Sequence, residues 1–92
     1  MAGVNKRRDR HEIVAEILKT VIEGKIKTHI MGNASLSYTQ IEEYLPLLIE
    51  KGFLENMSVK RKRQTRTMYR TTEKGMEFLD HLELINRLWT YQ

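Results

Sequence analysis

The fold of this chain is decided by residues 37–75, SYTQIEEYLPLLIEKGFLENMSVKRKRQTRTMYRTTEKG. Ser37 is a suitable N-cap, and Gln40 stands three residues later, where a capping box places Glu or Gln. This pair predicts a helix over residues 38–51. Gly52 follows directly and predicts a left-handed stop.

A hairpin is predicted after that stop. The strand-like stretches 53–59 and 67–71 flank the connector 60–66, which carries five cations and no acid. Thr72 then offers an N-cap for a further helix. The stretch therefore predicts a helix, a hairpin with a positively charged tip and a new helix.

Apolar residues on one side of the helix over 38–51 predict its buried face, which consists of Tyr38, Ile41, Leu45, Leu48 and Ile49. Pro46 interrupts this helix, because proline removes a hydrogen bond and crowds the preceding turn. The helix could end early or continue with a kink. The apolar period holds across Pro46, which favours the kink.

Two shorter helices are expected upstream. Asp9 and Glu12 form a capping-box pattern ahead of an apolar stripe, and Gly24 is expected to end this first helix. A second helix is predicted over residues 26–31, with Gly32-Asn33 as its stop. The stripe of the first helix comprises Ile13, Val14, Ile17, Leu18, Val21 and Ile22.

The last helix is predicted from Glu73 to about Thr90, which is long for so small a domain. Its apolar residues recur at the spacing of a coiled-coil seam. Burial of this stripe by a second copy is the simpler interpretation, although packing on the chain's own core stays open for Phe78 and Trp89. The seam residues are Phe78, Leu82, Ile85 and Trp89.

The composition favours one small domain in a reducing compartment. The chain has 92 residues and no cysteine, and none of its apolar runs approaches the ~20 residues of a membrane span. The N-terminal segment is polar and basic, unlike a signal peptide. We therefore expect a cytoplasmic protein.

The net charge of +4 is distributed unevenly along the chain. Basic residues cluster within 6–10 and 60–70, whereas acids gather on the predicted helices. Such clustering favours an anionic polymer as partner, although charge runs also occur as solvated faces or tails. For residues 6–10 both interpretations stay open. The second cluster belongs to a folded hairpin, which favours nucleic acid.

Catalysis and metal binding are not predicted. His11, His29 and His81 lie far apart in the sequence, and adjacent helical residues such as Glu42 and Glu43 point apart. A glycine-rich phosphate loop and a nucleophile–base pair are both absent from the sequence. We expect no enzymatic activity, no metal site and no cofactor.

Three helices, a two-strand wing and a trailing helix define a mainly helical α+β fold, the winged helix-turn-helix. Residues 1–8 are expected to form a basic N-terminal arm and residues 9–72 the winged-helix DNA-binding domain. Residues 73–92 are expected to form a C-terminal coiled-coil dimerisation helix.

Three segments, 36–41, 48–55 and 69–75, resemble a family of small archaeal winged-helix proteins. The family includes crenarchaeal chromatin-associated proteins that dimerise through a C-terminal antiparallel coiled coil. The resemblance implies binding of DNA in the nucleoid, with the third helix in the major groove and the wing near the backbone or minor groove. The implied recognition residues are Ser37, Thr39, Gln40 and Glu43. The implied wing residues are Lys60, Arg61, Lys62, Arg63 and Arg66.

The resulting hypothesis is a homodimer that binds double-stranded DNA as a transcriptional regulator or chromatin component. The alternative is a protein–protein adaptor whose basic wing docks an acidic partner. Ser37, Thr39 and Gln40 favour DNA, since an adaptor would present an apolar patch, whereas Leu47 favours the adaptor. Double-stranded RNA is disfavoured because a helix cannot read its deep, narrow groove.

Overall fold

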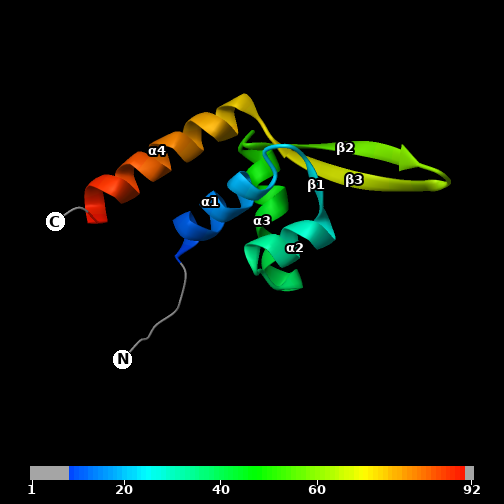
Figure 1. Cartoon of the computed structure of the whole chain (residues 1–92), viewed down its shortest axis with the longest axis horizontal. Helices are drawn as coiled ribbons and strands as arrows, with labels where there is room; N and C mark the ends of the chain where they lie inside the picture. Colours follow the sequence, from blue (N-terminus) through cyan, green and yellow to red (C-terminus); the bar gives the residue numbers. More distant parts are fainter. Residues whose placement is uncertain (1–8, 91–92) are drawn as a thin grey trace.

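The computed structural model describes residues 9–90. Three helices form a cluster, a β-hairpin projects from one side of it, and a long helix leaves the other side (Figure 1). The elements are, in order, α1 (Arg10–Thr20), β1 (Lys25–Ile26), α2 (Lys27–Ala34), α3 (Tyr38–Glu50), β2 (Leu54–Arg61), β3 (Gln64–Thr71) and α4 (Glu73–Thr90). This order confirms the predicted winged helix-turn-helix fold. The predicted N-terminal arm, residues 1–8, lies outside the described residues.

The hairpin of β2 and β3, which we call the wing, is longer and tighter than predicted. Its strands pair antiparallel as far as Arg61 and Gln64, so the turn consists of Lys62 and Arg63 alone. The prediction of a seven-residue tip was therefore wrong. Lys62 has a φ of 56°, and a residue with positive φ is what a two-residue hairpin turn requires. Solvent screens the repulsion between the exposed cations, so their charge does not prevent the strands from pairing.

The sheet has a third strand that the sequence analysis missed. β1 pairs antiparallel with β3, with Lys25 opposite Tyr69 and Ile26 opposite Met68, and the strand order is β1-β3-β2. Two residues are too few to produce a recognisable alternation of apolar and polar side chains. The strand nevertheless joins the start of α2 to the base of the wing.

The start of α1 was predicted correctly and its end was not. The Asp9 carboxylate accepts a hydrogen bond from the Glu12 amide at 2.9 Å, and the Glu12 carboxylate accepts one from the Asp9 amide at 3.3 Å. The helix ends at Thr20 with Val21 as C-cap. Gly24, the expected cap, instead has a φ of +94° in the turn that leads into β1.

The predicted stop of α2 at Gly32-Asn33 was also wrong. The helix continues through both residues, and Ser35 takes the left-handed conformation at its end with a φ of 55°. The extra turn buries Ala34 in the core. Apolar burial of this kind outweighs the weaker preference of Gly and Asn for helix.

The ends of α3 agree with the sequence analysis. The Gln40 amide donates to the Ser37 hydroxyl at 3.2 Å, and the Ser37 amide donates to the Gln40 side-chain oxygen at 3.0 Å. At the other end, the amides of Gly52 and Phe53 donate to Ile49 and Leu48, the pattern of a Schellman motif. The helix also continues through the exposed Pro46, as predicted.

One prediction about the buried face of α3 was wrong. Tyr38 is 60% exposed, while Tyr44 is buried instead. Tyr44 belongs to the face formed by Ile41, Leu45 and Leu48, which recur at the helical period, whereas Tyr38 is the first residue of the helix. The remaining core joins α1, α2, the start of β2 and the first half of α4.

Helix α4 packs on the core from its start to Leu82. The Thr72 hydroxyl accepts from the Gly75 amide at 3.0 Å and caps the helix, and Phe78 stacks on Phe53 with ring centroids 4.4 Å apart. Leu79 and Leu82 are buried, and α4 then extends past α1 (Figure 1). Beyond Leu82, the large apolar side chains of the helix are exposed.

Candidate nucleic-acid interface

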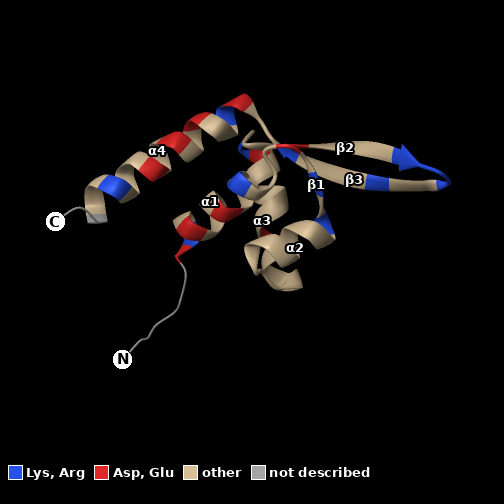
Figure 2. Ribbon diagram, viewed as in Figure 1, with Lys and Arg blue, Asp and Glu red and all other residues tan. Residues whose placement is uncertain are grey.

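The cations of the wing gather at the end of the hairpin that lies farthest from the helices (Figure 2). All five predicted wing residues are exposed: Lys60, Arg61, Lys62, Arg63 and Arg66. In the described part of the chain, carboxylates pair with Lys19, Lys27 and Arg70, and with none of these five. The wing thus presents positive charge that no carboxylate of residues 9–90 neutralises.

The strand register divides the wing cations between two faces. Side chains alternate along a strand, and Val59 pairs with Arg66 while Lys60 pairs with Thr65. Arg61 and Arg66 therefore project from one face of the hairpin and Lys60 from the other. The sequence analysis treated these cations as a single tip, which only Lys62 and Arg63 form.

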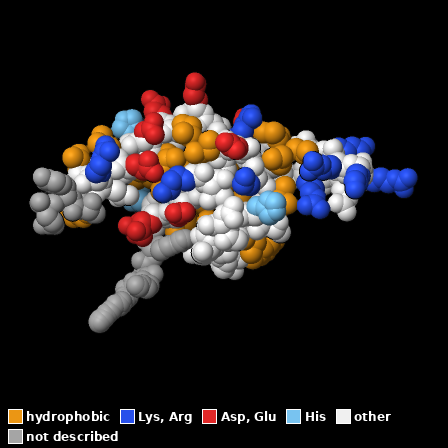
Figure 3. Space-filling view, viewed as in Figure 1, with side chains coloured by type: hydrophobic (Ala, Val, Ile, Leu, Met, Phe, Trp, Pro, Cys, Tyr) orange, Lys and Arg blue, Asp and Glu red, His pale blue; other side chains and the backbone are white. Residues whose placement is uncertain are grey.

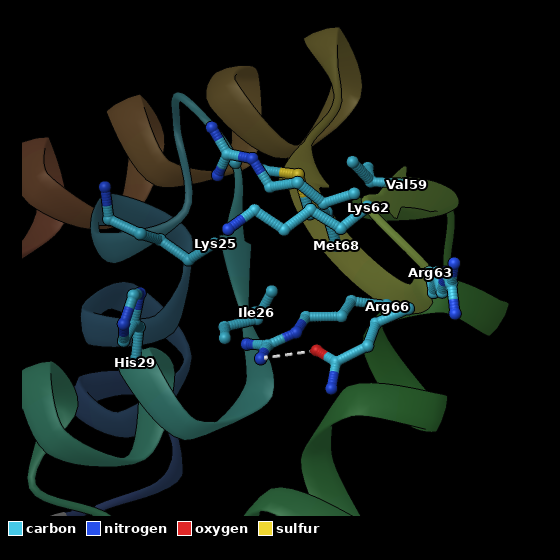
Figure 4. Close-up of a pocket in the computed structure, with 11 residues that line it drawn as sticks. Lys25, Ile26, His29, Val59, Lys62, Arg63, Arg66 and Met68 are labelled. Atoms are coloured by element: carbon cyan, nitrogen blue, oxygen red, sulfur yellow. Dashed lines mark hydrogen bonds between the residues drawn. The ribbon is translucent and has the colours of Figure 1, made fainter.

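The face with Arg61 and Arg66 borders a groove of about 1130 Å³ between the wing and the start of α2 (Figure 4). We call it the wing groove, and define it by Lys25, Ile26, His29, Arg61, Lys62 and Arg66. Lys62 and Arg66 extend toward β1 and α2, and Arg63 lines the groove near the hairpin turn (Figure 4). The Arg66 guanidinium donates to the Gln64 side-chain oxygen at 3.1 Å.

Sequence reasoning missed Lys25 and His29 as members of a basic surface. They stand 29 and 25 residues before the wing begins at Leu54, and the pairing of β1 with β3 brings them beside it. A single basic residue and a single histidine give no local signal of such a surface.

The predicted recognition residues of α3 fall into two groups. Ser37 and Gln40 bind each other in the capping box, so both side chains already hold the start of the helix. Thr39 and Glu43 are exposed and lie four residues apart, on one face of α3. Only these two have side chains that the cap does not engage.

The exposed surface of α3 is acidic, because the helix contains three glutamates and no lysine or arginine. Glu42 is neutralised by Lys27 of α2, whose ammonium donates to its carboxylate at 2.6 Å. This hydrogen bond lowers the pKa of Glu42 and raises that of Lys27. The Lys27 ammonium also lies 5.6 Å from the centre of the Tyr38 ring. Glu43 and Glu50 form no such ion pair within the described residues.

The residues of the predicted dimerisation stripe of α4 also fall into two groups, one buried and one exposed. Phe78 and Leu82 pack against the chain's own core, whereas Ile85 is 59% and Trp89 84% exposed. Leu88 is exposed beside them. The C-terminal half of α4 thus carries an apolar surface with no cover within the described residues.

Acidic side chains gather over α1 and α4, at the opposite end of the molecule from the wing cations (Figure 3). In residues 9–90 there is no group of three or more His, Cys, Asp or Glu side chains that could hold a metal ion. Within the same residues, no helix is both long and apolar enough to cross a membrane. Two features of the surface stand out: the basic tip of the wing and the exposed apolar residues at the C-terminal end of α4.

A three-helix cluster with a β-hairpin beside its third helix defines the winged helix-turn-helix class. The chain belongs to the winged helix-turn-helix family, whose model matches residues 7–90. No curated protein matches the chain.

Among the solved structures that share this fold are the following two. The crystal structure of Sso10a-2, a DNA-binding protein from Sulfolobus solfataricus, superposes with a TM-score of 0.78 at 26% identity, over 88% of this chain and 81% of that one. A PadR-like transcription factor from Bacteroides fragilis superposes with a TM-score of 0.69 at 22% identity, over 84% and 81% of the two chains. The first similarity confirms the resemblance to small archaeal winged-helix proteins.

Proposed function

We propose that this protein binds double-stranded DNA as a homodimer and acts as a transcriptional regulator or chromatin component. The observation that carries the proposal is a set of five exposed cations on the wing that form no ion pair with a carboxylate of the described residues. Phosphate groups bind Lys and Arg through charge and hydrogen bonds, and a projecting hairpin brings several of them to one backbone. The DNA-binding function named for Sso10a-2 supports the same conclusion.

In the proposed complex the start of α3 enters the major groove and the wing lies on the backbone or minor groove. Thr39 and Glu43 face the bases, and Glu43 accepts a hydrogen bond from cytosine N4. A protein with this partner belongs in the cytoplasm, with the nucleoid. The family and the fold give no support to an enzymatic role.

A salt series tests this proposal. If a dimer neutralises roughly six phosphates, the logarithm of the binding constant should fall against the logarithm of salt concentration with a slope of about −5. Replacing Lys60, Arg61, Lys62 and Arg63 with alanine should reduce the steepness by at least ~2, because each lost phosphate contact removes about 0.9. Fluorescence anisotropy with a labelled random duplex measures both slopes. Equal slopes in the two proteins would exclude the wing as the principal contact.

A second experiment concerns sequence preference. Gln40 is expected to donate from its side-chain nitrogen to adenine N7 while its oxygen holds the Ser37 amide. The change Gln40→Glu keeps the capping box but removes the donor, so it should relax preference by about 1–3 kcal/mol with α3 intact. Gln40→Ala removes both roles and controls for the loss of the cap. Binding-site selection that returns one motif from wild type and Gln40→Glu alike would rule out this role.

The adaptor alternative is favoured by one observation, the acidic surface of α3, which opposes phosphate. In that case the basic wing would dock an acidic protein instead. The salt series separates the two, because an adaptor would show no tight, steeply salt-dependent binding to duplex DNA.

A further inference from the structure

We infer that the wing groove holds one sugar–phosphate strand of the bound duplex, with Lys25 and His29 on its β1–α2 side as phosphate contacts in addition to Arg61 and Arg66 of the wing. This inference rests on the proposed DNA binding, and it adds a surface formed by β1 and the start of α2 to the interface. It also gives the two faces of the wing different roles.

Charge is the first argument for this surface. Outside the hairpin turn, the face of the wing toward α3 carries Lys60 as its strand cation, whereas the groove face carries Arg61 and Arg66. The groove is also lined by Lys25 and His29 on its β1–α2 side and by Lys62 and Arg63 of the turn. Helix α3 has three glutamates and no cation, so it repels the backbone that the groove attracts.

Shape and chemistry are the second argument. Ile26, Val59 and Met68 provide apolar surface between the two cationic walls (Figure 4). A sugar–phosphate strand has the matching pattern, since deoxyribose offers apolar contact area and the phosphates lie outside it. The volume of about 1130 Å³ exceeds that of most small-ligand pockets, ~300–1,000 Å³, and suits a segment of polymer.

The local structure orders both walls before a ligand arrives. The hydrogen bond to Gln64 restrains the Arg66 guanidinium, and the β1–β3 pairing fixes Lys25 relative to the wing. Prior ordering reduces the entropy lost when a phosphate binds. The absence of a carboxylate partner for Arg61, Lys62 and Arg66 among the described residues leaves their charge available.

The test compares two double variants that remove equal charge. Lys25→Gln with Arg66→Gln removes two positive charges from the groove, and Lys51→Gln with Lys74→Gln removes two from exposed lysines near the other end of the sheet. We expect the groove pair to lose at least about tenfold in duplex affinity at 0.1 M salt, and to flatten the salt slope by about 1.8. The control pair should change affinity by less than about threefold.

Nuclear magnetic resonance of the wild type supplies a readout that needs no variant. Addition of duplex DNA should shift the backbone amide signals of Lys25, His29 and Arg66. The amide signals of Lys51 and Lys74 should not shift. If the wild type binds with a steep salt slope but both double variants lose the same affinity, or Lys25 and His29 stay unshifted, the groove assignment is overturned and the proposed function stands. If the wild type does not bind duplex DNA, both fall.

Discussion

A variant with Ile85 and Trp89 replaced by glutamate is expected to sediment as a folded monomer, while the wild type sediments as a dimer at micromolar concentration. Both side chains are largely exposed, so the substitution leaves the core intact. In a dimer they pack against the partner's helix, where buried charge without a partner is strongly unfavourable. Analytical ultracentrifugation measures the change, and circular dichroism checks that the fold is kept.

DNA affinity is expected to fall in the same variant by about 10²–10⁴, because two linked domains act at a high effective concentration that a monomer loses. Arg87→Glu is a matched control, since it also lowers the net charge by two on the same helix, away from the apolar stripe. It should leave the dimer intact. A wild-type protein that remains monomeric at micromolar concentration would contradict the role of α4.

Leu82 is unsuitable for that experiment even though it belongs to the predicted stripe. It is 7% exposed within its own domain, so a charge there is expected to unfold the chain instead of separating two copies. The dimer contact is therefore expected to involve the last two turns of α4. An 18-residue helix spans ~27 Å, and pairing at the tips places the two wings far apart.

Gly75→Ala is expected to destabilise the domain by roughly 2–4 kcal/mol, although Gly75 lies in the first turn of a helix. A Cβ at this position would collide with the Phe53 carbonyl oxygen and would also contact Thr71. That oxygen accepts a hydrogen bond from the Thr72 amide at 3.0 Å, so moving it disturbs the junction of sheet and helix. Thermal unfolding at fixed protein concentration measures the loss.

Gly32→Ala is the matched control, because the same change in α2 meets open space. Alanine is the better helix former, so this variant should be more stable than wild type by about 0.5–1 kcal/mol. If both variants lose the same stability, close packing at Gly75 is not the reason for its glycine.

Features that depend on a few neighbouring residues were predictable from the sequence. The capping boxes at Asp9 and Ser37 and the stop at Gly52 all formed as expected, since each joins a side chain or an amide to backbone a few residues away. The positions of α3 and α4 followed from the same signals and from their apolar period.

Features that depend on distant packing were not predictable. Burial of Ala34 carries α2 past Gly32, and pairing with β3 creates the two-residue strand β1. The wing groove depends on that same pairing, so Lys25 and His29 come to lie beside the wing cations only in the folded chain. For the predicted site, the sequence identified the cations but not the face of the hairpin from which each projects.

The two-residue turn of the wing ties its charge pattern to its length. If one residue were inserted in a single strand, every side chain of that strand between the insertion and the turn would project from the opposite face. An insertion in β2 before Lys60 would thus exchange the faces from which Lys60 and Arg61 project. Two residues added to each strand would lengthen the wing by about 7 Å and keep every side chain on its face. Wings of related chains are therefore expected to differ in length by an even number of residues per strand. Whether a strand gains an odd or an even number of residues decides, more than composition does, which face of the wing carries each cation.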